Sequence, residues 1–91
     1  MISLIVPIWN EENNILPFLR AIKEYLINES YEIIFVADPC NDNSIKIVKE
    51  EAIKFKFIKL ILMSRRFGQP MAILAGLKKC KGDCAIVIDV D

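Results

Sequence analysis

The stretch that decides the fold is residues 31–63, YEIIFVADPCNDNSIKIVKEEAIKFKFIKLILM. Its first part, YEIIFVA, is an apolar run typical of a buried β-strand, and the polar DPCND that follows predicts a loop. The segment NSIKIVKEEAIKF places Ile45 and Val48 on one face of a helix. Asp42 or Asn43 can cap the start of that helix. KFIKLILM then returns to a strand, so the stretch predicts one β-α-β unit with parallel strands.

The same alternation continues on both sides of this unit. Strands are predicted for ISLIVPI (2–8) and CAIVIDV (84–90), and helices for NILPFLRAIKEYLINE (14–29) and QPMAILAGLKKCKG (69–82). The order β-α-β-α-β-α-β predicts helical crossovers onto one parallel sheet. The strands are continuous runs of Val, Ile and Leu, which predicts that helices cover both faces. We therefore expect a doubly wound α/β fold with strand order 3-2-1-4.

The composition limits the classes of function. The chain has 91 residues with 12 basic and 12 acidic side chains, so no global charge favours nucleic acid as a partner. It has no histidine, which excludes Ser-His-Asp and Cys-His catalysis within these residues. Three cysteines are an odd number, which favours reduced, structural thiols. Neither a signal peptide nor a membrane-spanning run is recognisable, so we expect a cytoplasmic chain.

Polar side chains gather where the predicted strands end. They are Pro7, Trp9, Asn10, Glu11 and Glu12 after the first strand, Asp38, Asn41 and Asp42 after the second, Ser64, Arg65, Arg66 and Gly68 after the third, and Asp89 and Asp91 in the fourth. Doubly wound sheets bind ligands at this edge, near the point where the strand order reverses. We therefore expect Asp91 and the loop 7–10 to line one cleft, with Asp38 beside them.

Asp89 and Asp91 form a D-x-D pair, and on an extended strand their side chains point the same way. Carboxylate oxygens suit Mg²⁺ or Mn²⁺, which take remaining ligands from water and substrate phosphates. For an isolated D-x-D, a pair of solvated turn residues is the more frequent explanation. The sequence has no G-x-G-x-x-G and no Walker loop, so bound phosphates would need the metal and Arg65 or Arg66 as counter-charges. Two solvated arginines are an equally weighted alternative.

Four ordered segments together resemble the N-terminal half of an inverting family 2 glycosyltransferase with the GT-A fold, and within it the polyprenyl-phosphate (dolichyl-phosphate-mannose-synthase-like) sugar transferases. The segments are VPIWNEENNI (6–15), EIIFVADPCNDNS (32–44), LMSRRFGQPMAILAGL (62–77) and GDCAIVIDVD (82–91). The resemblance spans essentially the whole chain. It implies that residues 1–91 are the nucleotide-sugar-binding part of a larger glycosyltransferase domain.

The resemblance also implies roles for individual residues. Pro7 and Trp9 match the loop that contacts the base and ribose of a UDP- or GDP-linked sugar, and Asn10 and Glu11 complete that loop. Asp38 matches the second acidic residue of the family's DDGS segment, which hydrogen-bonds the base. Arg65 and Arg66 lie near the segment that approaches the donor phosphates. Asp89 and Asp91 match the pair that binds the donor's Mg²⁺ or Mn²⁺, with Asp91 as the direct ligand.

The chain departs from the family pattern at three places. The first acidic residue of DDGS is Ala37, its Gly-Ser is Pro39-Cys40, and the usual asparagine before Phe-Gly is Arg66. These changes predict an altered loop geometry and either a divergent donor specificity or a partly decayed site.

The segment that follows the D-x-D in the family, with the catalytic base, is not in these 91 residues. We therefore expect a fragment that is inactive alone, from a protein that transfers sugar to a polyprenyl phosphate. Membrane association would come from segments outside the chain, and the exposed sheet edge could form a homodimer. A non-catalytic nucleotide- or partner-binding module is the alternative. A receiver-like signalling domain is a weaker third, because it needs an acidic pair after the first strand and an aspartate after the third, where this chain has Ser64 and two arginines.

Overall fold

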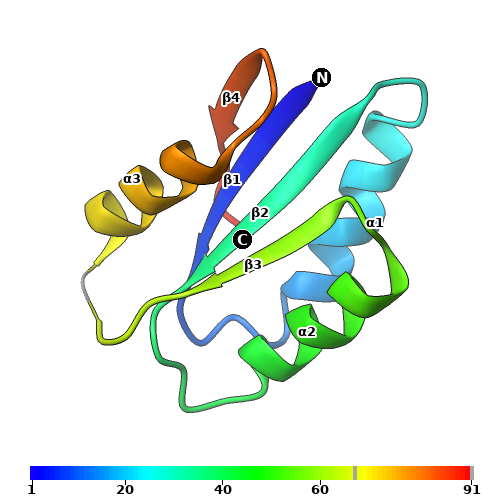
Figure 1. The fold of residues 1–91 in the computed structure, drawn as a ribbon. Coiled ribbons are helices and arrows are strands. Elements are labelled where there is room, and N and C mark those ends of the chain that lie inside the picture. Colours follow the sequence, from blue (N-terminus) through cyan, green and yellow to red (C-terminus); the bar gives the residue numbers. More distant parts are fainter. Residues whose placement is uncertain (67, 91) are drawn as a thin grey trace.

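The computed structural model describes residues 1–66 and 68–90, which form a four-stranded sheet between two layers of helices (Figure 1). The elements are β1 (Ile2–Ile8), α1 (Ile15–Tyr25), β2 (Tyr31–Ala37), α2 (Ser44–Lys54), β3 (Ile58–Leu62), α3 (Gln69–Lys79) and β4 (Cys84–Val87). The predicted order of helices and strands is confirmed. The sequence places most boundaries within a few residues, and α1, α3 and β4 end earlier than predicted, at Tyr25, Lys79 and Val87.

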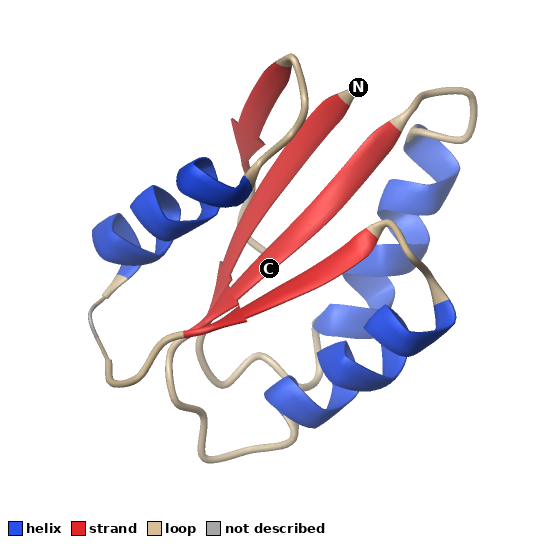
Figure 2. Cartoon of the chain, viewed as in Figure 1, coloured by secondary structure: helices blue, strands red, loops and turns tan. Residues whose placement is uncertain are grey.

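All pairings in the sheet are parallel, and the strand order is β3-β2-β1-β4, as predicted. The register aligns Ile8 of β1 with Ala37 of β2, and Ala37 with Leu62 of β3. The carboxyl ends of these three strands therefore lie side by side at one edge of the sheet (Figure 2). The loops that carry the predicted site residues leave the sheet from this edge.

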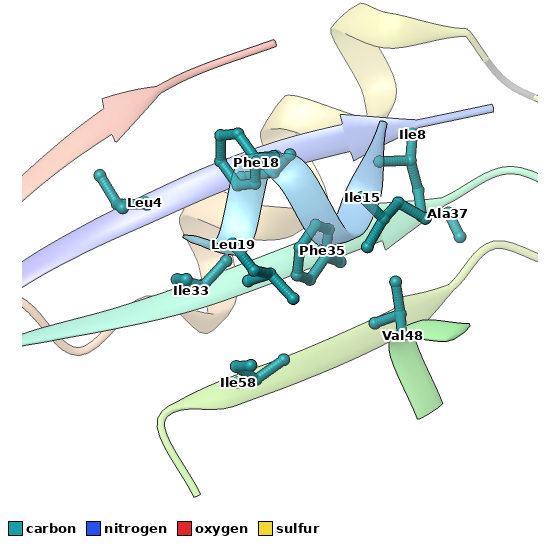
Figure 3. Close-up of a cluster of buried hydrophobic side chains, with 11 residues drawn as sticks. Leu4, Ile8, Ile15, Phe18, Leu19, Ile33, Phe35, Ala37, Val48 and Ile58 are labelled. Atoms are coloured by element: carbon teal, nitrogen blue, oxygen red, sulfur yellow. The ribbon is translucent and has the colours of Figure 1, made fainter. Parts of the chain in front are cut away.

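The larger core lies between the sheet and the two helices α1 and α2. Its buried members are Leu4, Val6, Ile8, Ile15, Phe18, Leu19, Ile33, Phe35, Ala37, Val48 and Ile58. The rings of Phe18 and Phe35 meet edge to face with centroids 6.1 Å apart, joining α1 to β2 (Figure 3). Burial of this set is the dominant stabilising contribution to the fold, because each large aliphatic or aromatic side chain contributes about 1.5–3 kcal/mol.

The opposite face of the sheet is covered by α3. Its buried core is smaller and consists of Ile5, Ile34 and Val36 from the sheet and Ala72 from the helix. Successive side chains of a strand point to opposite faces, so each central strand supplies alternate residues to the two cores. This two-sided burial explains why the β1 and β2 sequences are continuously apolar.

Gly76 sets how closely α3 approaches the sheet. A Cβ atom at this position would lie 2.5 Å from Cγ2 of Ile5 and 3.3 Å from Cγ2 of Val36. Such distances are below van der Waals contact, so the helix rests on β1 and β2 only because residue 76 has no side chain.

The prediction that both faces of every strand are covered is wrong for β4. All four residues of β4 are exposed, including Ile86 and Val87. The reason is that α3 packs against β1 and β2, and β4 is the last strand of the described sheet. An exposed strand edge is consistent with the expected homodimer, which stays a prediction.

A buried carboxylate anchors the opposite, amino-terminal edge of the sheet. The Glu32 side chain is 3% exposed and pairs with Nζ of Lys59. It also accepts hydrogen bonds from Oγ of Ser3 and the backbone N–H of Lys81, and Ser3 Oγ accepts one from the N–H of Gly82 at 2.8 Å. These contacts connect β1, β2 and β3 to the turn that precedes β4.

Burial alone would raise the pKa of Glu32, but the hydrogen bonds from Lys59, Ser3 and Lys81 outweigh it and lower the pKa to about 2. Because the folded-state pKa lies below the ordinary value, the stabilisation is complete above about pH 4.5 and decreases as the pH falls toward 2. The shift corresponds to an upper limit of about 3 kcal/mol.

We expect Glu32→Gln to lower the free energy of unfolding by about 3 kcal/mol at pH 7, with the difference from the unsubstituted chain decreasing toward zero near pH 2. Urea unfolding between pH 2 and 7 measures this. Glu50→Gln, at an exposed position of α2, is the control and should change little. A Glu32→Gln effect that is constant across this range would contradict the assignment.

We expect Gly76→Ala to destabilise the fold by about 1–3 kcal/mol through overpacking, although alanine is the better helix former. The double variant Gly76→Ala/Ile5→Ala should lose less than the sum of the two single changes, because it removes the clashing methyl group. Chemical unfolding of the three variants measures the coupling. Simple additivity would show that the helix moves away from the sheet at little cost.

Candidate nucleotide site at the carboxyl edge

A cavity of about 220 Å³ opens at the carboxyl edge of the sheet, beside the first turn of α3. Its lining residues are Pro7, Ile8, Trp9, Glu11, Asp38, Arg66, Gly68, Gln69, Ala72 and Asp89. They come from the ends of β1 and β2, from the segment between β3 and α3, from α3 itself and from the residues after β4. The cavity therefore lies where sheets of this type bind ligands.

Most of the predicted site residues come together in this cavity. Pro7, Trp9, Glu11, Asp38, Arg66 and Asp89 all line it. Asn10 and Arg65 are not among the described lining residues, and Asp91 lies outside the residues that the structure describes.

Three further lining residues were not predicted. Ile8 and Ala72 are apolar residues that the sequence does not distinguish from core positions. Gln69 could have been predicted from the sequence. It is the first residue of α3, and a helix that follows a parallel strand begins at the carboxyl edge of the sheet.

Asp38 forms the buried part of the cavity wall. The residue is 5% exposed, its N–H donates to the carbonyl of Ile8, and its Oδ2 accepts the N–H of Gly68 at 3.1 Å. Gly68 has φ of +89°, a conformation that glycine adopts without strain. The second oxygen, Oδ1, is buried without a hydrogen-bond partner among the described residues. A buried acceptor in this state favours a ligand that donates a hydrogen bond.

Trp9 and Arg66 form a stacked pair at the cavity. The guanidinium carbon Cζ of Arg66 lies 3.7 Å from the centroid of the Trp9 ring. This cation–π contact places the guanidinium group over one face of the indole. The N–H groups at the edge of a guanidinium plane stay available for an anion when its face is stacked. Arg66, which stands where the family pattern has an asparagine, thus has an aromatic partner in Trp9.

Asn10 connects two loops. It has φ of +53°, and its side-chain Oδ1 accepts the N–H of Asn41 at 2.8 Å. Its own N–H is directed at Sγ of Cys40 (3.5 Å), and that thiol donates to the carbonyl of Asp38. Cys40, which replaces the serine of the family segment, therefore holds the loop after β1 against the loop after β2. A direct contact of Asn10 with a nucleotide stays a prediction.

Three further hydrogen bonds extend this connection. The N–H of Glu11 donates to Oγ of Ser44 at 2.7 Å, and the N–H of Glu12 donates to Oδ2 of Asp42. Asp42 Oδ1 accepts the N–H of Ser44, so Asp42, and not Asn43, provides the side-chain cap of α2. Burial would raise the pKa of Asp42, and its hydrogen bonds to Ser44 and Glu12 outweigh that and lower it.

Asp89 reaches the cavity from the residues that follow β4. The preceding N–H, of Ile88, still donates to the carbonyl of Ile5 at 3.0 Å, so the backbone stays paired with β1 up to this point. The Oδ1 atom of Asp89 accepts a hydrogen bond of 2.9 Å from Nε2 of Gln69. Among the described residues, no group of three or more Cys, Asp or Glu is arranged to hold a metal ion.

The donor chemistry of this wall nevertheless fits a hard divalent cation. Asp89 supplies carboxylate oxygen, and Mg²⁺ and Mn²⁺ commonly take one or two carboxylates and complete their shell with water and phosphate oxygens. The described lining residues include three carboxylates, Glu11, Asp38 and Asp89, against one cation, Arg66. An anionic ligand would therefore be repelled here unless a cation accompanied it.

The fold and this cavity define the chain as an α/β domain of the GT-A class. Residues 3–91 match the family model for glycosyl transferase family 2, and the chain belongs to this family.

Two relatives show how far the similarity extends. The chain is 38% identical to the uncharacterized glycosyltransferase YkcC of Bacillus subtilis, covering 98% of the chain and 28% of the relative. It is 36% identical to the undecaprenyl-phosphate 4-deoxy-4-formamido-L-arabinose transferase of Pseudomonas fluorescens, covering 99% and 27%. The chain thus spans little more than a quarter of the length of these proteins.

Two solved structures share the fold. S. aureus TarS 1–349 in complex with UDP superposes with a TM-score of 0.83 at 24% identity, covering 99% of this chain and 27% of that one. The mannosyltransferase PcManGT of Pyrobaculum calidifontis, in complex with GDP-Man and Mn²⁺, superposes with a TM-score of 0.85 at 22% identity, with the same coverage.

Each of the three helices in the described residues has 11 residues, which is too short to cross a membrane.

We expect Asn10→Gly to destabilise the chain by about 1 kcal/mol, because it loses the hydrogen bond to Asn41. Asn10→Ala should cost about 2 kcal/mol, because alanine also tolerates the left-handed region less well than asparagine or glycine does. Urea unfolding separates the two, with Asn13→Ala at an exposed position of the same loop as the control. Equal effects of glycine and alanine would mean that the left-handed backbone relaxes in the variants.

Proposed function

We propose that the protein containing this chain transfers a sugar from a nucleotide-diphosphate donor to a polyprenyl phosphate, and that residues 1–91 bind the donor. The observation that carries the proposal is the unpaired, buried Oδ1 of Asp38 in the wall of the cavity. A nucleobase such as uracil or guanine presents a ring N–H that can satisfy this oxygen. Leaving such an acceptor unpaired costs about 1–3 kcal/mol, which ligand binding recovers.

The rest of the cavity suits the other parts of such a donor. Pro7 and Trp9 supply apolar surface beside the base and ribose, and Glu11 supplies a carboxylate that already accepts the side-chain amide of Asn14 at 2.8 Å. Arg66 is proposed to bind the diphosphate through the N–H groups of its guanidinium. Arg65, on the exposed side of the same segment, is proposed to add to the positive potential.

Asp89, with Asp91 outside the described residues, is proposed to hold Mg²⁺ or Mn²⁺. When bound, the ion would neutralise the donor diphosphate and stabilise it as it leaves. One solved structure with the same fold, the mannosyltransferase PcManGT, is a complex with GDP-Man and Mn²⁺. The excess of carboxylates over cations among the described lining residues supports metal-dependent binding independently of that likeness.

The acceptor is proposed from the relatives. One of them is named an undecaprenyl-phosphate transferase, and a phosphate oxygen of such a lipid would attack the anomeric carbon of the sugar with inversion. Inversion needs a base positioned near the acceptor. Asp38 and Asp89 are assigned to donor and metal, so we do not assign the base to either of them.

Nucleotide binding tests the proposal directly. The chain has one tryptophan, so its fluorescence should change when UDP or GDP occupies the cavity, and the change should require Mn²⁺ or Mg²⁺. We expect Asp38→Asn to weaken binding at least about tenfold, because the amide no longer offers a free carboxylate oxygen to a ring N–H. The asparagine can still accept the Gly68 N–H, so thermal stability should change little.

Asp83→Asn, at the opposite edge of the sheet, is the matched control and should leave binding unchanged. Binding that is equally strong in Asp38→Asn, or the absence of nucleotide binding by a folded chain, would refute the donor site. Binding without transfer by the whole protein would favour the non-catalytic module.

A further inference from the structure

We propose that Gln69 is a positioning residue for the metal: its side-chain amide orients the carboxylate of Asp89 so that this group can bind the divalent cation. The inference rests on the proposed function, because it concerns the same donor site. Gln69 lines the cavity, and its Nε2 donates to Oδ1 of Asp89 at 2.9 Å.

The backbone on both sides of this contact is fixed. Gln69 follows Gly68, whose N–H is bound to the buried carboxylate of Asp38 at 3.1 Å, and Pro70 restricts the next position of the helix. Asp89 follows Ile88, whose N–H pairs with Ile5. The side chain of Asp89 is exposed, so in the absence of Gln69 it would be free to rotate away from the cavity. The amide thus restricts the side-chain torsions of Asp89, which the fixed backbone leaves free.

The chemistry of the donor matters as much as its position. An amide N–H is neutral, so it directs the carboxylate without cancelling its negative charge. A lysine at this position would form an ion pair with Asp89 and compete with the metal. An ionised glutamate could not donate a hydrogen bond and would repel Asp89.

Hydrogen bonds to metal-ligating carboxylates typically change metal affinity by about 10–100-fold. The contact between Gln69 and Asp89 is exposed, so we expect an effect at the lower end of this range.

The test is a double-mutant cycle read out by Mn²⁺ binding. Electron paramagnetic resonance of free Mn²⁺, with saturating UDP or GDP, gives the affinity without any turnover. We expect Gln69→Met, which keeps the length of the side chain and removes the amide, to weaken Mn²⁺ binding about tenfold. In an Asp89→Asn background the same change should have no further effect, because Gln69 acts through Asp89. Gln69→Lys should weaken Mn²⁺ more than Gln69→Met does.

Thermal unfolding separates positioning from a structural role, and the unfolding temperature should be unchanged in Gln69→Met. Unchanged Mn²⁺ affinity in Gln69→Met, or an equal loss in both backgrounds, would overturn the inference and leave the donor site standing. A loss of stability in parallel with affinity would also overturn it. If the unsubstituted chain binds nucleotide but no Mn²⁺, or if Asp89→Asn has no effect, the metal site itself is wrong and the inference with it.

Discussion

The two central strands, β1 and β2, are buried on both faces, and this constraint determines which polar residues the sheet can contain. Helices lie on either side of these strands and exclude water. A polar side chain there is destabilising unless all its polar atoms are hydrogen-bonded. Glu32 and Asp38 are the two buried carboxylates at the start and just past the end of β2. Glu32 is held by Lys59, Ser3 and Lys81, whereas one oxygen of Asp38 has no partner among the described residues. The same constraint therefore separates an acid that stabilises the fold from one that is available to a ligand.

The cavity depends on contacts between loops more than on any single strand. The segment before α3 and the first residue of that helix make three contacts with the wall: Arg66 with Trp9, Gly68 with Asp38 and Gln69 with Asp89. On the other side, the thiol of Cys40 and the hydroxyl of Ser44 hold the loop after β1. Preorganised loops of this kind lower the entropic cost of ordering a site when a ligand binds.

The sequence predicted the fold because its signals are local and agree with one another. Continuous apolar runs, helical spacing and loop residues all favoured the same α/β order, which the structure confirms. The exposure of β4 could not be predicted from these local signals, because its sequence, CAIV, is as apolar as the buried strands. Its exposure depends instead on where α3 packs. In the cavity, Trp9, Asp38 and Asp89 were found because polar or aromatic residues at strand ends are conspicuous. The pairing of Trp9 with Arg66 and the contact from Gln69 depend on side-chain directions that no spacing rule supplies.

The anchor formed by Glu32 lies at the amino-terminal edge of the sheet, and the cavity lies at the carboxyl edge. The substituted positions of the family pattern, Ala37, Pro39, Cys40 and Arg66, all lie in or near the second region. The contacts of Glu32 and the cavity are therefore at opposite edges of the sheet. A substitution that reshapes the cavity leaves the ion pair and hydrogen bonds of Glu32 intact, so the lining can change without loss of this anchor.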